Sequence, residues 1–174
     1  MKAQHSTTDD QSELFIVVDK RDRIVGYRTR HDCHHDKALI HRGANLVIFD
    51  DLGRTLLQKR SKTKDIRPGY WQNAVGGHVS KGESYQKAMV RESEEELGIR
   101  VPVRFYKKFL FGYANETEME AVYIATCNGP FHPNQTEIDH VTFMHKNELQ
   151  RSHSSGKVKL TELAEYIFEL VGYL

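Results

Sequence analysis

Residues 77–99 read GHVSKGESYQKAMVRESEEELGI and decide the fold of this 174-residue chain. We expect a helix over Ser84–Leu97, because Gly98 stands where a left-handed glycine would end it. Gly77 is the first residue of this segment and follows Gly76. Two adjacent glycines allow the backbone to approach a ligand closely. The segment therefore predicts a glycine-rich loop that leads into a helix, with a ligand near the place where the two meet.

Three carboxylates cluster on one side of the expected helix. At about 100° per residue, Glu92, Glu95 and Glu96 share an arc roughly 100° wide, and Met89 and Leu97 occupy the adjoining arc. Like charges at this spacing cost a helix about 0.2–0.5 kcal/mol per pair. A divalent cation would turn this repulsion into coordination, and oxygen ligands suit Mg²⁺ or Mn²⁺. The alternative is an acidic face that is simply solvated.

The spacing of the whole segment argues against a solvated face. Seven identities stand at fixed positions, and chance agreement is about 10⁻⁸ per starting position at residue frequencies of about 5–7%. The segment resembles the Nudix box of the Nudix hydrolase superfamily. The seven identities are Gly77, Glu83, Arg91, Glu92, Glu95, Glu96 and Gly98, and Ile99 also matches the pattern. Ser93 replaces the usual aliphatic residue, and we expect its hydroxyl to bond back to the Met89 carbonyl.

This resemblance implies an α/β fold, namely a three-layer α/β/α sandwich with a mixed β-sheet. It also implies hydrolysis, in which water attacks a pyrophosphate phosphorus in a nucleoside diphosphate linked to a further group. The cofactor would be Mg²⁺ or Mn²⁺. By family role, its ligands would be Glu92, Glu95, Glu96 and the backbone carbonyl of Gly77. Glu92 or Glu95 would act as the general base. Arg91 would orient a neighbouring carboxylate, and Glu83 would support the junction between loop and helix.

The resemblance extends over roughly residues 13–150, toward the branch of the superfamily that contains isopentenyl-diphosphate isomerase and its hydrolase relatives. That isomerase binds a metal through histidines and glutamates. The residues at the corresponding spacings here are His34, His41, His78, Glu118 and Glu120. If they converge, they form a second metal site, which would favour Zn²⁺ or Mn²⁺ over Mg²⁺. The alternative is that a histidine-rich turn produces the spacing by accident.

The isomerase reaction depends on a catalytic cysteine immediately before the Gly-His pair. In this chain that position is Gly76, and neither Cys33 nor Cys127 occupies it. Because glycine cannot move a proton to or from carbon, we expect a hydrolase rather than an isomerase. A non-catalytic nucleotide-sensing domain is the third alternative, and the complete set of carboxylates argues against it.

Residues outside the box are candidates for contact with the substrate. Arg60 and Lys64 belong to a basic stretch whose cations would either meet substrate phosphates or stay solvated. Glu137 lies where Nudix enzymes often place a further carboxylate over the metal. Specificity depends on such loops, so the fold alone does not name the substrate.

Composition bounds the remaining properties. With 39% hydrophobic and 28% charged residues and a mean hydropathy of −0.62, the chain predicts one folded domain over residues 13–174 after a flexible polar tail over residues 1–12. A formal net charge of +1 suggests neither a nucleic-acid polymer nor a membrane surface as partner. The apolar runs are too short for a membrane span. We expect a cytoplasmic protein that acts on a small phosphorylated molecule, and the resemblance implies a homodimer.

Hydrophobic patterning places the other elements. Strands are expected over residues 13–19, 24–28, 41–50, 55–60, 71–75, 101–113, 119–127 and 141–145. Residues 31–37 read as a turn or a short helix, and further helices are expected over 146–150 and 158–173. Residues 55–60 should return as the hairpin partner of 41–50, and a turn over Asn115–Glu118 should join the two strands of the second half.

Overall fold

Strand β3 (Ile40–Phe49) is the centre of a mixed sheet of nine strands in the computed structural model. The structure describes residues 9–64 and 66–174. Strand β3 runs parallel to β8 (Thr117–Thr126) along its whole length, and antiparallel to β1 (Leu14–Val18) and β6 (Val75–His78). Of the flexible tail expected over residues 1–12, residues 1–8 lie outside the described part of the chain.

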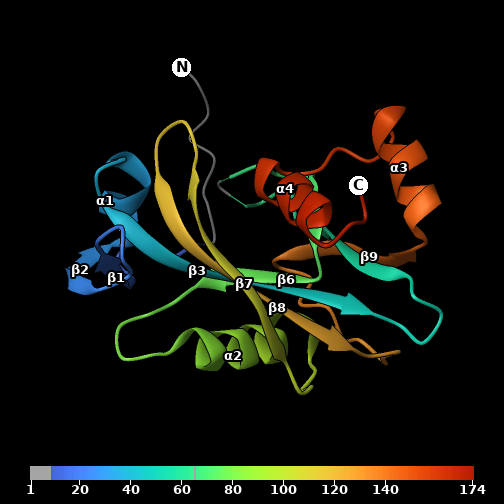
Figure 1. Cartoon of the computed structure of the whole chain (residues 1–174), viewed down its shortest axis with the longest axis horizontal. Helices are drawn as coiled ribbons and strands as arrows, with labels where there is room; N and C mark the ends of the chain where they lie inside the picture. Colours follow the sequence, from blue (N-terminus) through green and yellow to red (C-terminus); the bar gives the residue numbers. More distant parts are fainter. Residues whose placement is uncertain (1–8, 65) are drawn as a thin grey trace.

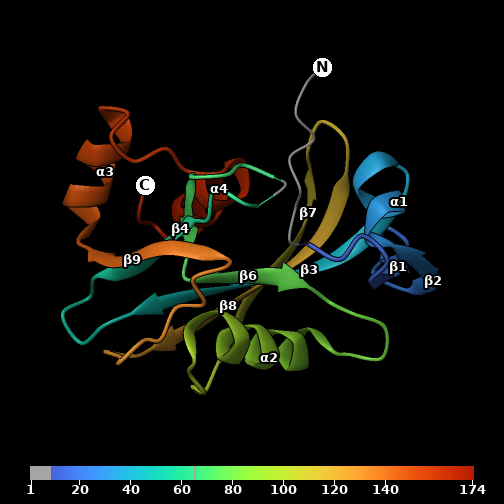
Figure 2. The same cartoon turned by 180° about the vertical axis from the view of Figure 1, so that it is seen from behind.

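Helices cover both faces of this sheet, with α2 (Tyr85–Leu97) below it and α4 (Glu162–Leu170) above it in Figure 1 and Figure 2. Successive side chains of β3 point to opposite faces. Leu46 therefore packs in the cluster that contains Met89 of α2, whereas Val47 packs with Ile167 of α4. This arrangement confirms the expected three-layer α/β/α fold with a mixed sheet. No helix of the described residues is long and apolar enough to cross a membrane.

The bounds of the remaining helices and strands follow from the N-terminus to the C-terminus. These elements are β2 (Ile24–Thr29), α1 (Arg30–His35), β4 (Thr55–Arg60), β5 (Trp71–Asn73), β7 (Arg104–Gly112), β9 (Ile138–Met144) and α3 (Lys146–Ser154).

Helix α2 has the ends that the sequence predicts. Ser84 caps its first turn through the side-chain oxygen, and Gly98 ends it with a φ of 65°. Inside the helix, the Ser93 hydroxyl donates to the Met89 carbonyl at 2.6 Å. The polar residue at the aliphatic position of the box is therefore buried with its hydrogen bond satisfied, as expected.

The pairing of strands differs from the expectation in two places. β3 and β4 meet at a single residue pair, Phe49 and Thr55, instead of forming a long hairpin. The reason is that β6 and β8 flank β3, so that β4 pairs with β5 and β9 instead. The turn before β8 also comes earlier than expected, because β8 already begins at Thr117. The strand expected over residues 71–75 is divided between β5 and β6.

Candidate active site

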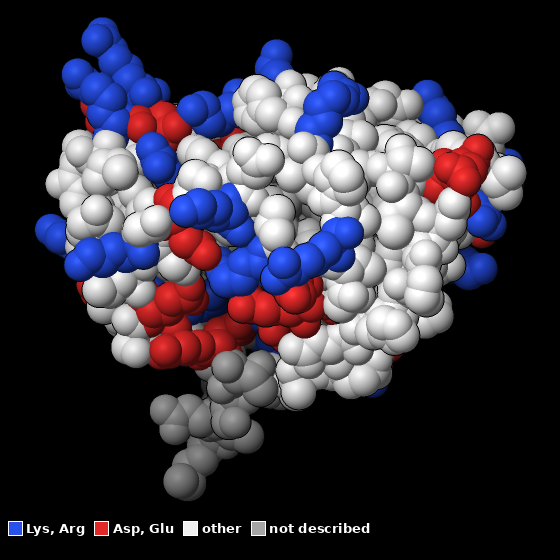
Figure 3. Space-filling model, turned by 90° about the horizontal axis from the view of Figure 1, so that it is seen from below, with Lys and Arg blue, Asp and Glu red and all other residues white. Residues whose placement is uncertain are grey.

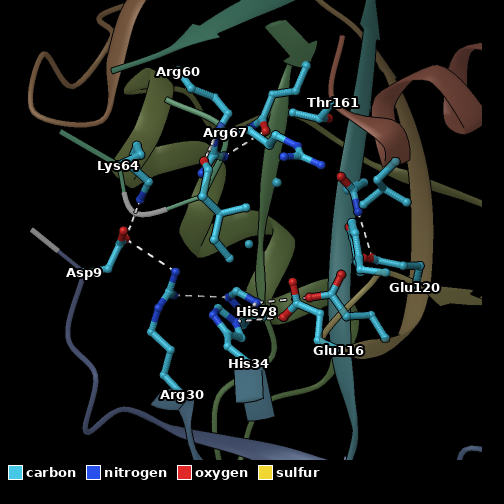
Figure 4. A pocket seen from close by; sticks show the side chains of 18 of the residues that line it. Asp9, Arg30, His34, Arg60, Lys64, Arg67, His78, Glu116, Glu120 and Thr161 are labelled. Carbon is cyan, nitrogen blue, oxygen red and sulfur yellow. Dashed lines mark hydrogen bonds and ion pairs between the residues drawn. The ribbon is translucent and has the colours of Figure 1, made fainter. Parts of the chain in front are cut away.

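One pocket of about 870 Å³ carries both groups of residues that the sequence singles out. The carboxylates of α2 line one part of it. His34, His78 and Glu116 line another part (Figure 4). Lys64 and Arg60 lie along a third part. The pocket therefore brings together residues from the N-terminal segment, α1, α2, β6 and the turn before β8.

Glu92 lies directly over the backbone of Gly77. A β-carbon at residue 77 would overlap the Glu92 carboxylate, so only glycine fits this position without displacement. The Glu92 side chain is 14% exposed. Burial raises the pKa of Glu92 to about 7 although the charge of Arg91 opposes the shift, and the charges of Glu95 and Glu137 raise it further.

Glu96 is the second buried carboxyl of α2. Gln58 on β4 donates to its Oε2 at 2.7 Å. Burial raises the pKa of Glu96 well above its usual value, and the charges of Glu92 and Glu137 add to the rise. These carboxyls also repel one another, and a cation among them would stabilise their ionised forms and so oppose both shifts.

Arg91 ties the carboxylates of this region together. Its Nε donates to Glu83 Oε1 at 2.8 Å, and its Nη1 donates to Glu92 Oε1 at 2.9 Å and to Glu95 Oε2 at 3.0 Å. The hydrogen bond from Arg91 is the main reason that the pKa of Glu83 is lowered. Glu83 also accepts from the backbone N–H of Ser80 at 3.2 Å, so it joins the loop to the helix.

His34 and His78 line the other end of the pocket, and the fully buried His41 adjoins them. Each of the three histidines offers a ring nitrogen within 4.8 Å of the others. Burial is the main reason that the pKa of His34 is lowered to about 2 and that of His78 to about 4. Both rings are therefore neutral near pH 7, as metal ligation requires. Phe15, which is fully buried, stacks on His78 at 4.1 Å and on His41 at 5.4 Å between ring centroids.

Two glutamates complete this histidine group. Glu118 Oε1 lies 3.0 Å from His41 Nε2 and 3.1 Å from His78 Nε2. Glu116 Oε2 lies 3.4 Å from His34 Nε2 and 3.9 Å from His41 Nε2. Sequence reasoning missed Glu116 because residues 116, 118 and 120 are all glutamates, and the pattern does not tell which pair lies beside the histidines. Phe15 was missed because an apolar strand residue carries no signal of its own.

The register between β3 and β8 explains why Glu120 is placed differently. Glu118 lies beside His41, whereas Glu120 lies beside Gly43, where a β-carbon would come within 2.5 Å of its carboxylate. Asn45 donates to Glu120 at 2.8 Å. Burial raises the pKa of Glu120 well above its usual value, and it forms a hydrogen bond with Glu118. Among the described residues, neither group of convergent ligand atoms includes Glu120.

The predicted substrate-binding residues lie around the loop that follows β4. Arg60 is the last residue of β4, Lys64 lies in the loop, and Glu137 directly precedes β9. Arg60 donates to the carbonyl of Ile66 and to the side chain of Gln72, both at 2.9 Å, and so holds the loop against β5. Lys64 Nζ lies 3.4 Å from Glu137 Oε2. Viewed from below, the surface gathers acidic side chains with basic ones directly beside them (Figure 3).

Comparisons with known proteins identify the family of the chain. A family model described as the NUDIX domain matches residues 39–164. The chain is 36% identical over 141 residues to the uncharacterized Nudix hydrolase PA4841 of Pseudomonas aeruginosa, covering 80% of this chain and 82% of that protein. It is 32% identical over 140 residues to an isopentenyl-diphosphate Delta-isomerase of Mycolicibacterium vanbaalenii, covering 76% and 77%. The crystal structure of DR0079 from Deinococcus radiodurans matches the fold with a TM-score of 0.79 at 24% identity, over 90% of this chain and 98% of that chain.

Proposed function

The chain belongs to the Nudix family, and we propose that it is a divalent-cation-dependent pyrophosphohydrolase that acts on a nucleoside diphosphate linked to a further group. The observation that carries this proposal is the mutual placement of Glu92 and Glu96. Burial raises the pKa of both carboxyls, and the charge of Glu92 adds to the rise at Glu96. A site that concentrates negative charge in this way suits a cation and, through it, a phosphate.

The donor set fits Mg²⁺ or Mn²⁺, because all of its candidate ligands are oxygens. Glu92, Glu95, Glu96 and the Gly77 carbonyl would hold the cation. When bound, the cation neutralises charge on the phosphate and lowers the pKa of water. Gly77 supports this assignment, since its lack of a β-carbon lets its backbone lie against the Glu92 carboxylate.

The protein's own groups orient the reactants. Arg91 fixes Glu92 and Glu95 through hydrogen bonds of 2.9 and 3.0 Å, so the carboxylates keep one geometry. Glu95 is the more accessible of these two, with 53% of its side chain exposed against 14% for Glu92. We therefore assign to Glu95 the removal of the proton from the attacking water. Lys64 lies where it can neutralise a phosphate oxygen beside Glu137.

We further propose that the histidine group is a second metal centre of the same pocket. His34, His41, His78, Glu116 and Glu118 supply its donors. The neutral imidazoles and the short distances between their ring nitrogens support this assignment. Imidazole donors favour Zn²⁺ or Mn²⁺ over Mg²⁺.

Isomerisation of a prenyl diphosphate is the second candidate function, because the histidine group is also the part that resembles the isomerases. The residue at the position of their cysteine argues against it. Gly76 has no side chain that can carry a proton, and a β-carbon there would lie 3.0 Å from Asn45 Oδ1. A side chain would therefore crowd the amide that holds Glu120. Hydrolysis remains the function that the site supports best.

A substrate panel tests the proposal. The chain is incubated with Mg²⁺ and nucleoside triphosphates, nucleoside diphosphates and nucleoside diphosphate conjugates, and released phosphate, pyrophosphate and nucleotide are quantified. The proposal predicts cleavage of a pyrophosphate bond that disappears with EDTA and in Glu92→Gln. Binding of nucleotides without turnover would identify a sensing domain instead, and an isomerised prenyl product would identify the alternative enzyme.

A further inference from the structure

We propose that Asp9 is a specificity-determining residue whose carboxylate occupies an anion subsite, formed by Arg30 and Lys64, that a phosphate group of the substrate takes by displacing it. This inference rests on the proposed function and adds an internal competitor to it. The N-terminal segment that carries Asp9 would thus set which substrates enter this part of the pocket.

The geometry of these three residues is that of an occupied anion site. The Asp9 Oδ1 atom lies 2.5 Å from Lys64 Nζ and 3.6 Å from Arg30 Nη2. A single carboxylate oxygen therefore bridges two cations that come from different parts of the chain, the start of α1 and the loop after β4. Figure 4 shows all three side chains pointing toward one another inside the pocket.

The three charged side chains of this anion site are largely buried. The exposed side-chain fractions are 8% for Asp9, 9% for Arg30 and 12% for Lys64. Charges removed from water to this extent need compensation by opposite charge. A phosphate offers more negative charge than a carboxylate, and it matches the planar guanidinium of Arg30 with two oxygens. An incoming phosphate can therefore replace Asp9 without leaving the two cations uncompensated.

Arg30 and Lys64 place this subsite between the histidine group and the carboxylates of α2. Arg30 Nη1 lies 3.5 Å from His78 Nδ1, so the subsite adjoins the histidine group. Lys64 Nζ lies 3.4 Å from Glu137 Oε2, and the charge of Lys64 offsets part of the rise that burial causes in the pKa of Glu96. A phosphate chain that reaches the α2 carboxylates therefore passes this pair of cations.

The segment that carries Asp9 lies outside the sheet. Residues 9–13 precede β1 and form no part of the sheet before Leu14. The N–H of His31 donates to the Gln11 carbonyl at 3.2 Å, and that of Arg30 donates to the Glu13 carbonyl at 2.8 Å. Withdrawal of Asp9 can therefore occur without breaking a strand pair of β1.

Binding of inorganic pyrophosphate to the full chain in EDTA tests the subsite without any metal or turnover. We expect Asp9→Asn to lower the dissociation constant at least tenfold in calorimetry. Asp10→Asn is the matched control, because this exposed neighbour carries the same charge and bonds to Ser12. It should change the constant less than twofold. An unchanged or larger constant in Asp9→Asn would overturn the proposal, since a merely structural ion pair gives no gain in anion affinity.

Two further measurements close the test. In Asp9→Asn/Lys64→Met the gain should vanish, and its persistence would contradict the subsite. In the unmodified chain, pyrophosphate should speed hydrogen exchange in residues 9–13, and unchanged or slower exchange would show that Asp9 stays in place. This second measurement remains decisive if Asp9→Asn fails to fold.

Kinetics separate this inference from the proposed function. With a hydrolysable substrate, Asp9→Asn should lower KM while kcat changes less than twofold. Hydrolysis with an unchanged KM would contradict the proposed subsite but not the proposed hydrolase function. Tighter pyrophosphate binding in Asp9→Asn without hydrolysis of any substrate would support the subsite and contradict the hydrolase function.

Discussion

The Glu92 carboxylate and the Gly77 backbone lie in such close contact that a β-carbon at residue 77 would overlap the carboxylate. This relationship joins the first residue of the segment 77–99 to helix α2. Arg91 strengthens the junction, because it donates both to Glu92 and to the carbonyl oxygen of His78. The loop and the helix therefore form one unit that positions the carboxylates.

Replacement of Gly77 by alanine should disrupt this unit. We expect Gly77→Ala to lower turnover at least about 100-fold, equivalent to about 2.7 kcal/mol in the barrier, because Glu92 must move. Gly26→Ala is the control, since a β-carbon there makes only an ordinary contact of 3.8 Å with Arg28. Steady-state rates with Mg²⁺ check both variants. Full activity in Gly77→Ala would show that the contact does not position Glu92.

Stabilisation by Mg²⁺ should increase with pH. Burial raises the pKa of Glu92 from its usual 4.5 to about 7. Between these values the unfolded chain has lost a proton that the metal-free folded chain retains, so the free energy of unfolding falls as pH rises. A bound cation replaces that proton. At about 100 times its dissociation constant, a ligand adds about 2.7 kcal/mol, or roughly 5–10 °C for a chain of this size.

Thermal unfolding with and without Mg²⁺ measures this effect. The gain in Tm should be larger at about pH 8 than at about pH 6. It should disappear in Glu92→Gln and persist in Glu94→Gln, whose parent carboxylate pairs with Arg100 on the exposed side of α2. An equal gain at both pH values would count against a cation held by these buried carboxyls.

The histidine group should bind about one equivalent of Zn²⁺ that excess Mg²⁺ does not displace, because imidazole donors prefer the softer ion. His41→Asn and Glu116→Gln should each weaken this binding at least about tenfold, the usual range for the loss of an important partner of a metal site. Glu120→Gln serves as the comparison and should weaken it less than Glu116→Gln. Competition calorimetry gives these affinities. Equal retention of Zn²⁺ in all three variants would place the ion elsewhere.

The placement of Glu116 shows where prediction from sequence stops. The carboxylates of α2 were predictable because the period of a helix relates residues that are close in the chain. The period of a strand likewise relates the glutamates at residues 116, 118 and 120, although in the structure Glu116 directly precedes β8. It does not tell which of them lies beside His41, since that depends on the register with β3.

Contacts between segments that are distant in the chain were likewise not predictable from the sequence. The turn between β3 and β4 was recognisable locally, but the flanking strands of β3 leave β4 only one paired residue on it. The contact of Asp9 with Arg30 and Lys64 joins three distant segments. No local pattern marks such a contact, whereas the two ends of α2 are marked by Ser84 and Gly98.

The chain should not isomerise isopentenyl diphosphate. Gly76 has no side chain that can supply the proton transfer. Incubation with isopentenyl diphosphate and Mg²⁺ or Zn²⁺, followed by chromatography of the products, checks this expectation. Formation of the isomer above the background without protein would reverse the choice between hydrolase and isomerase.

Turnover of Glu96→Gln at saturating Mg²⁺ tests the central claim most directly. The substitution keeps the shape of the side chain and its position near Gln58 but removes the charge that would hold the cation. The account predicts a fall in kcat of at least about 100-fold, or about 2.7 kcal/mol, while Glu94→Gln retains normal activity. A kcat for Glu96→Gln close to that of the unmodified chain would contradict the assignment of this carboxylate to the catalytic metal site.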